Sequence, residues 1–320
     1  MIRLLRAEIS RLLSRRFTLI AGIAVLLALG AFQLAVNEAI APPTGEDLAS
    51  AQRAFEEERR DWVENHEKYE QECQEAGEPP ENCVYEEPTL ENYIGTQTFD
   101  EVADISLQVS IYLVALTALM VAGSFIGAEY STGSIANWLS FIPRRGRVFA
   151  AKLITVVTLT ALASAVCAAL MIGIAVGLAN WYDVPVVKLA DTAAMGARGI
   201  LITVALAVTG FCIALVGRHT AAAIGVLLGY LFVWFVRNAV LSGFEWAARL
   251  TPWTPEGNLS AVVNKGYTYE IPVEKLTATG VDYDYVERTV TLAHGLTYWG
   301  IVLAVLIVAA ALIFRRRDVS

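Results

Sequence analysis

The sequence has little charge for its length and lacks the short motifs that mark common catalytic sites. Only 18% of its 320 residues are charged and 56% are hydrophobic, whereas a soluble domain has about 25% charged and roughly 45–50% apolar residues. GxxxxGK[ST], HExxH and GxSxG motifs are all absent, and the three histidines are scattered. We therefore expect no P-loop ATP hydrolysis on this chain, no catalytic residues and no metal site. The chain is not expected to be an enzyme.

The hydrophobic residues are concentrated in six runs, each near the length of about 20 residues that spans a bilayer as a helix. The expected spans are residues 17–36, 105–128, 153–178, 199–216, 220–236 and 292–314, the third to fifth lying within 148–236. The fourth and fifth are short, so a tight helical hairpin that does not fully cross is the alternative. The fold class expected is an all-α polytopic membrane protein.

Charge is distributed unevenly between the connecting segments. Residues 37–104 hold 20 acidic and four basic residues, a net charge of −16. Basic residues flank the spans on the other side, in residues 1–16, 129–147 and 315–320. Lys and Arg near span ends mark the cytoplasmic side. We therefore expect both termini, including the tail 315–320, in the cytoplasm and a multi-pass protein of the cell membrane, with no role for nucleic acid.

The first 16 residues have apolar side chains at helical spacing and a polar face rich in arginine. Such a segment is typical of an amphipathic helix lying in the bilayer interface. The alternative is a basic flank that only orients the first span.

Residues 37–104 are long enough to form a small helical extracytoplasmic domain between the first two spans. Glu46 and Asp47 indicate a helix start, and a helical pattern follows from about Leu48 to Ala76. Phe55, Trp62 and Tyr69 recur every seven residues on one face. The stripe they form either contacts the spans or a partner, or is the packed side of the helix.

Two of the four cysteines lie in this acidic domain. Cys73 and Cys83 are ten residues apart, on either side of a Gly- and Pro-containing turn. A disulfide is favoured in an oxidising compartment, and metal binding by two isolated thiols is the alternative. Cys167 and Cys212 lie in expected spans, where they would pack as small apolar residues.

A second external segment, residues 237–291, follows the fifth span. Its start, residues 239–250, is apolar but too short to cross, which predicts a re-entrant or interfacial helix. Residues 267–290 resemble a short hairpin or an irregular cap. Arg198 and Arg237, near outer helix ends, are expected to extend toward the interface. The pairs Gly173/Gly177 and Gly225/Gly229 fit intramolecular helix packing, with a dimer interface as the alternative.

Residues 129–147, between the second and third spans, predict a short amphipathic helix broken at Pro143 and followed by a basic turn. Ile135, Trp138 and Leu139 would share one face of this helix. Such a face suits either docking into a groove on a soluble protein or contact with the membrane surface alone.

The same segment carries a pattern that resembles the ABC-2 type permeases, the membrane subunits of ABC exporters. The pattern is Glu-x-x-x-Gly-[Ser/Thr], an apolar stretch, Pro, Arg and a Lys at the start of the next span. Here it is matched by Glu129, Gly133, Ser134, Pro143, Arg144 or Arg145, and Lys152. The order of segments, from the basic entry helix to the last span, extends the resemblance over most of the chain.

The resemblance implies a permease subunit of an ATP-driven exporter that works with a separately encoded ABC ATPase, which would bind the ATP and Mg²⁺. It also implies pairing with a second copy or a paralogous permease. The residues expected to couple to the ATPase are Glu129, Tyr130, Gly133, Ser134, Asn137, Trp138, Arg144 and Arg145. The first outer loop is longer than in simple members of that family, which leaves the cargo undetermined. The competing hypothesis is a membrane sensor or assembly factor whose outer domain binds a ligand.

Overall fold

The structure is a computed structural model that describes residues 2–77, 79–94, 98–135, 144–241, 243–277 and 280–316. Within these residues, six helices are long and apolar enough to cross a membrane, which confirms the predicted all-α polytopic fold. They are α2 (Arg16–Ile40), α4 (Phe99–Ser131), α6 (Arg145–Trp181), α7 (Leu189–Gly217), α8 (Thr220–Ala239) and α11 (Leu292–Arg316). Several extend beyond their apolar runs because polar flanking residues continue the helix. At 29 and 20 residues, α7 and α8 are each long enough to cross a bilayer.

Helices α4 and α7 form the centre of the bundle and are its most buried spans. Glycine lets them approach closely: a Cβ built on Gly210 would lie 2.2 Å from the carbonyl oxygen of Leu119. Helices α2, α6, α8 and α11 pack around this pair. In contrast, a Cβ on Gly173, Gly177, Gly225 or Gly229 would meet no described atom within 4 Å. The prediction that these four glycines pack within the chain is therefore wrong.

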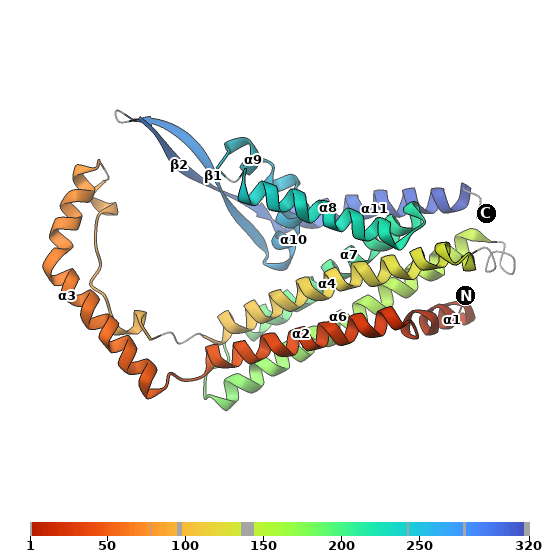
Figure 1. Cartoon of the computed structure of the whole chain (residues 1–320), viewed down its shortest axis with the longest axis horizontal. Helices are drawn as coiled ribbons and strands as arrows, with labels where there is room; N and C mark the ends of the chain where they lie inside the picture. The colour runs from red at the N-terminus through yellow and green to blue at the C-terminus, as the bar shows by residue number, and fades with distance from the viewer. Residues whose placement is uncertain are drawn as a thin grey trace.

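Both chain termini lie at one end of the bundle, the termini end, and the other end is called the distal end here (Figure 1). Helix α1 (Ile2–Leu13) lies at the termini end, beside the first turns of α6. Helix α3 and a β-hairpin extend beyond the distal end (Figure 1). The acidic domain and the basic flanks are thus at opposite ends of the molecule.

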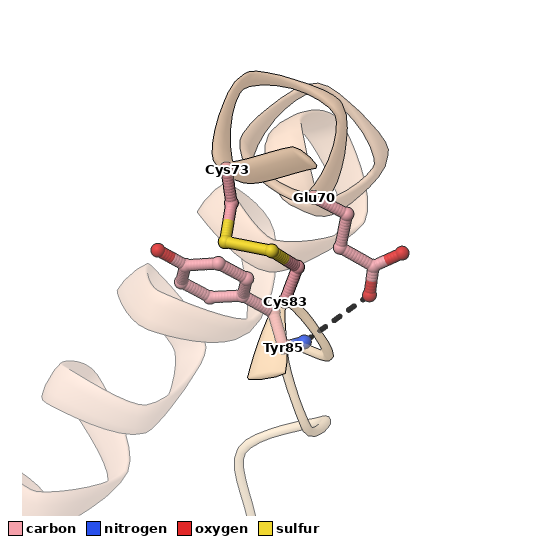
Figure 2. The surroundings of a disulfide bond; sticks show 4 residues. All are labelled: Glu70, Cys73, Cys83 and Tyr85. Atoms are coloured by element: carbon pink, nitrogen blue, oxygen red, sulfur yellow. Dashed lines mark hydrogen bonds between the residues drawn. A yellow bond between two sulfur atoms is a disulfide. The ribbon is translucent and has the colours of Figure 1, made fainter. Parts of the chain in front are cut away.

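The distal domain is built on the single long helix α3 (Gly45–Glu75), which begins with a capping box formed by Thr44 and Asp47. After α3, the chain returns through short 3-10 turns at Pro80–Asn82 and Leu90–Asn92. A disulfide joins Cys73 to Cys83, as predicted. Figure 2 shows this bond beside the hydrogen bond that the Tyr85 amide donates to Glu70, 3.1 Å long.

The aromatic stripe on α3 packs against the returning segment. Tyr93 packs edge-on against Phe55, with ring centroids 6.1 Å apart, and Tyr85 lies 5.7 Å from Tyr69. The Trp62 indole donates a 2.8 Å hydrogen bond to the carbonyl of Tyr85. The stripe is therefore the packed side of a helix, one of the two predicted alternatives.

The second distal segment differs from its prediction. Instead of one dipping helix over 239–250, the chain forms α9 (Glu245–Arg249), a 3-10 turn at Thr251–Trp253 and α10 (Pro255–Val263). An antiparallel hairpin follows, with β1 (Gly266–Thr277) paired to β2 (Gly280–Thr291) along twelve residues each. The predicted short hairpin is therefore much longer. Alternating β-branched and aromatic residues sustain the pairing although acidic residues interrupt the apolar pattern.

Candidate functional site

Helix α1 carries a carboxylate on the face that it buries. Its side chains at Leu5, Glu8 and Leu12 are spaced three and four residues apart, so they project from one side of the helix. Glu8 is fully buried and Leu12 is nearly so. Arg15, which follows the helix, donates a 2.6 Å hydrogen bond to the carbonyl of Ser124 in α4. The N-terminal segment is thus a docked amphipathic helix.

A buried lysine connects α1 to α4 and α6. The Nζ of Lys152, in the second turn of α6, lies 2.8 Å from Glu8 Oε2 and 2.7 Å from Glu129 Oε2. The relative exposures of the three side chains are 1%, 0% and 2%. Removing ions from water is costly unless they are paired. Separating α1, α4 and α6 would therefore leave buried charges without partners, and this cost holds the three helices together.

An arginine completes the charge balance of this group, which we call the charge cluster: Glu8, Arg11, Glu129 and Lys152. Arg11 NH1 lies 3.4 Å from Glu129 Oε1 and 3.7 Å from Glu8 Oε1. Two carboxylates thus face two cations. The Lys152 ammonium also lies 4.8 Å from the ring centroid of Phe125, within the range of a cation–π contact.

The charge cluster lies directly behind the segment that joins α4 to α6. Helix α4 ends at Ser131, two residues after Glu129, and Gly133 adopts a left-handed conformation with φ of 68°. The Ser134 hydroxyl donates to the carbonyl of Glu129 at 3.4 Å. Motion of the connecting segment would therefore act on the backbone beside Glu129.

The other expected coupling residues fall around this point. Tyr130 is half-buried against the core, and Arg144 and Arg145 lie at the start of α6. Asn137 and Trp138 lie outside the described residues. Ile135, expected on an exposed apolar face with Trp138 and Leu139, is instead buried.

Glu129 and Lys152 match the sequence pattern between the second and third spans, whereas Glu8 was not singled out in the sequence. A single acid within a basic helix looks unremarkable, yet its spacing from Leu5 and Leu12 places it on the apolar face. A carboxylate on such a face needs a buried cation. This signal could have indicated a partner such as Lys152, although it could not have identified which one.

A second group of polar contacts lies toward the distal end. Arg237 NH2 lies 2.8 Å from Glu256 Oε1, and the Tyr230 hydroxyl hydrogen-bonds to the same carboxyl group. Arg198 donates to the carbonyl of Val263 at 2.9 Å. Both arginines, which were expected to extend toward the interface, thus bond to protein groups. Glu256, at the start of α10, was not singled out in the sequence.

Among the described residues, no three or more His, Cys, Asp and Glu side chains are grouped so that they could hold a metal ion. The buried charges are instead paired with one another across helices. This arrangement suits a structural or mechanical role at a membrane boundary.

Comparison with known proteins agrees with this architecture. A family model described as ABC-2 family transporter protein matches residues 4–319, which covers α1, all six long helices and the charge cluster. No curated protein is matched significantly by the chain. Since the family model covers nearly the whole sequence, the chain belongs to the ABC-2 family of transporter proteins.

Proposed function

We propose that this permease exports its cargo, driven by an ABC ATPase on a separate chain that docks at the termini end. The family makes the chain a membrane permease of an ABC transporter. The observation that carries the proposal further is the charge cluster, because it ties three helices together immediately behind residues 129–147. ATP and Mg²⁺ would be bound by the partner ATPase.

The proposed orientation places the termini end in the cytoplasm and α3 outside the cell. Arginines in α1 and at the end of α11 flank the spans at the termini end. The domain beyond the distal end is strongly acidic. This distribution agrees with the preference for Lys and Arg in cytoplasmic segments. The distal disulfide also fits an oxidising compartment.

In the proposed mechanism, the ATPase pushes on the segment between α4 and α6 when it closes on ATP. Glu129 transmits this displacement to α6 and α1 through Lys152, since breaking the contact would expose unpaired charges to a dry interior. The three helices would then move as one unit. Glu129 and Lys152 are accordingly positioning residues, whereas the exposed parts of residues 129–147 contact the ATPase.

We also infer that two permeases assemble with two ATPases. Helix α8 exposes many large apolar side chains, including Leu228, Phe232 and Phe235. Gly225 and Gly229 on the same helix have open space around them. Small residues of this kind allow helices of two chains to approach closely. The partner would be a second copy or a paralogue.

The first test is intact-complex mass spectrometry of the C-terminally tagged chain, purified from its native membrane in mild detergent. We expect a P-loop ATPase at matching copy number and a mass that contains two permeases. Recovery with a kinase, or with no ATPase, would contradict the proposal and favour the sensor hypothesis.

The second test compares ATP turnover by that complex when it carries Glu129→Gln, Trp138→Ala or the control Glu64→Gln. Glu64 is an exposed acid on α3, far from the termini end. We expect Glu129→Gln and Trp138→Ala to retain the ATPase yet lose most of the dependence of its turnover on the permease. Glu64→Gln should behave as the unmodified complex. Unchanged turnover in both coupling variants would contradict the mechanism.

A further inference from the structure

The distal domain contains a cavity of about 370 Å³ between α3 and the segment that returns from it. Its lining combines aromatic rings with carboxylates: Glu58, Asp61, Trp62, Tyr69, Tyr85, Glu86, Glu87, Pro88, Thr89, Asn92 and Tyr93. Four of these residues are aromatic and four are acidic, and none is basic. Helix α3, which forms one wall of the cavity, lies at the opposite end of the molecule from α1 (Figure 1).

Covalent and polar links fix the walls of this cavity. The disulfide Cys73–Cys83 joins the returning segment to the end of α3. Two residues further on, the Tyr85 amide donates to Glu70, as Figure 2 shows, and the Tyr85 carbonyl accepts from Trp62. The rings of Trp62, Tyr69 and Tyr85 are therefore held in place before any ligand arrives, which lowers the entropic cost of binding.

Some of the carboxylates that line the cavity have an ion-pair or hydrogen-bond partner, and others have no ion-pair partner among the described residues. Glu87 lies 3.3 Å from Arg59, and Asp61 accepts a 2.7 Å hydrogen bond from Asn65. Within the part of the chain that the structure describes, neither Glu58 nor Glu86 has an ion-pair partner. Two negative charges thus remain uncompensated beside aromatic rings.

Tyr93 forms part of the cavity wall together with Glu58. Its ring packs against Phe55. Desolvation, with a smaller contribution from the charge of Glu58, raises the pKa of the Tyr93 hydroxyl. Glu58 and Glu86 are exposed, so a cation can reach both carboxylates from solvent.

We propose that this cavity binds an organic cation, a guanidinium or alkylammonium group, between the aromatic rings and the carboxylates of Glu58 and Glu86. Aromatic faces attract such cations, and the carboxylates supply the opposite charge. The acidic lining excludes anions, and the rings favour an organic cation over a strongly hydrated metal ion. The group belongs to either a small free cation or a basic side chain of a peptide. The proposal does not depend on the partner ATPase.

The test uses the full-length protein in nanodiscs of zwitterionic lipid, without reductant. Binding is measured by isothermal titration of arginine amide, a hexa-arginine peptide, a hexa-citrulline peptide of the same shape without charge, and Ca²⁺. The variants are Glu58→Gln/Glu86→Gln and the matched control Glu64→Gln/Glu67→Gln, whose side chains lie on α3 but do not line the cavity.

We expect the cationic probes to bind and the citrulline peptide not to bind. Glu58→Gln/Glu86→Gln should weaken binding about tenfold, whereas the control should change it less than about twofold. Equal affinity per site for arginine amide and the peptide would identify a small free cation as the ligand. Markedly tighter peptide binding would identify a basic peptide.

Three results would overturn the proposal. The first is binding of citrulline and arginine peptides with equal affinity. The second is equal weakening by both double variants, which would mean that the cations respond only to the total charge of the domain. The third is no binding of either cationic probe, whether or not Ca²⁺ binds. Circular dichroism and an intact disulfide by mass confirm that each variant is folded.

Discussion

The two ends of the molecule use glutamate in opposite ways. At the termini end, Glu8 and Glu129 are buried and paired with Lys152 and Arg11. At the distal end, acids along α3 are mostly exposed, and ion pairs such as Lys68–Glu72 are formed in solvent. The two buried acids hold three helices in place, whereas the many exposed ones set the electrostatic potential around the distal domain.

This difference shows that the density of charge in a sequence is a poor guide to the energetic weight of each charge. A residue in the acidic domain can lose its charge at little cost, because water and salt already screen it. Glu8, Glu129 and Lys152 are shielded from solvent, so water and salt do not replace a lost partner there. Substitutions that remove one charge at each end therefore test whether burial decides how much a charge contributes to stability.

The largest effect is expected for Lys152→Met, which removes the cation closest to both buried carboxylates and leaves them the longer contacts with Arg11. Breaking a buried ion pair typically costs about 3–5 kcal/mol. The thermal unfolding midpoint in nanodiscs should fall strongly. The matched control is Lys188→Met, since Lys188 pairs with Asp100 but is 66% exposed, and its midpoint should barely change.

A triple variant distinguishes the loss of charge pairing from the loss of packing. Glu8→Gln/Glu129→Gln/Lys152→Met removes both buried carboxylates that the single variant deprives of lysine. Arg11 then loses its contacts with these carboxylates but is partly exposed to solvent, so much of the stability should return. If the triple variant is no more stable than Lys152→Met, pairing is not what holds these helices together.

An intermediate effect is expected for Cys73→Ser/Cys83→Ser. The bond closes a loop with a sequence separation of 10 residues, for which the loss of chain entropy predicts about 3 kcal/mol. Hydrogen exchange should accelerate in residues 83–93, while α4 and α7 remain protected. Equal acceleration in the central helices would show that the distal domain and the bundle unfold together.

The smallest effect concerns the start of α3. The Asp47 carboxylate accepts from the Thr44 amide at 2.8 Å and from its hydroxyl at 2.7 Å, and these hydrogen bonds lower the pKa of Asp47. Because the folded value lies below the unfolded one, this stabilisation is present above the unfolded pKa and is lost as the pH falls through the folded pKa.

Hydrogen exchange at the first turn of α3, corrected for the intrinsic pH dependence of exchange, measures this effect. Protection should decrease in acid in the unmodified protein. In Asp47→Asn it should be lower at neutral pH and nearly independent of acidification. An acid-induced decrease of the same size in Asp47→Asn would assign the effect to another group.

The sequence predicted the helices well because long apolar runs and periodic patterns are local signals. The six spans and α3 depend on such signals, and the disulfide depends on two cysteines close in sequence. Glu8, the third member of the group with Glu129 and Lys152, was not predictable in this way, since Glu8 and Lys152 are 144 residues apart. Only the docking of α1 against α6 brings them together.

Two further errors also concern contacts that local sequence patterns do not encode. The hairpin β1–β2 was underestimated because strand pairing is decided between strands, not within one of them. The link between Arg237 and Glu256 was missed because α9 and the 3-10 turn after α8 redirect the chain and bring Glu256, at the start of α10, beside Arg237. Glycine spacing alone was also misleading, since it does not show which side of a helix has a neighbour.

Helix α6 gives the charge cluster a reach beyond its immediate surroundings. The helix runs without proline from Arg145 to Trp181, about 55 Å at 1.5 Å per residue. Lys152 lies near one end of this rod and the edge of the distal domain lies near the other. A small change in the tilt of α6 at Lys152 therefore produces a displacement that grows with distance along the helix. The distal end of α6 can move by ångströms while the contacts around Lys152 are kept.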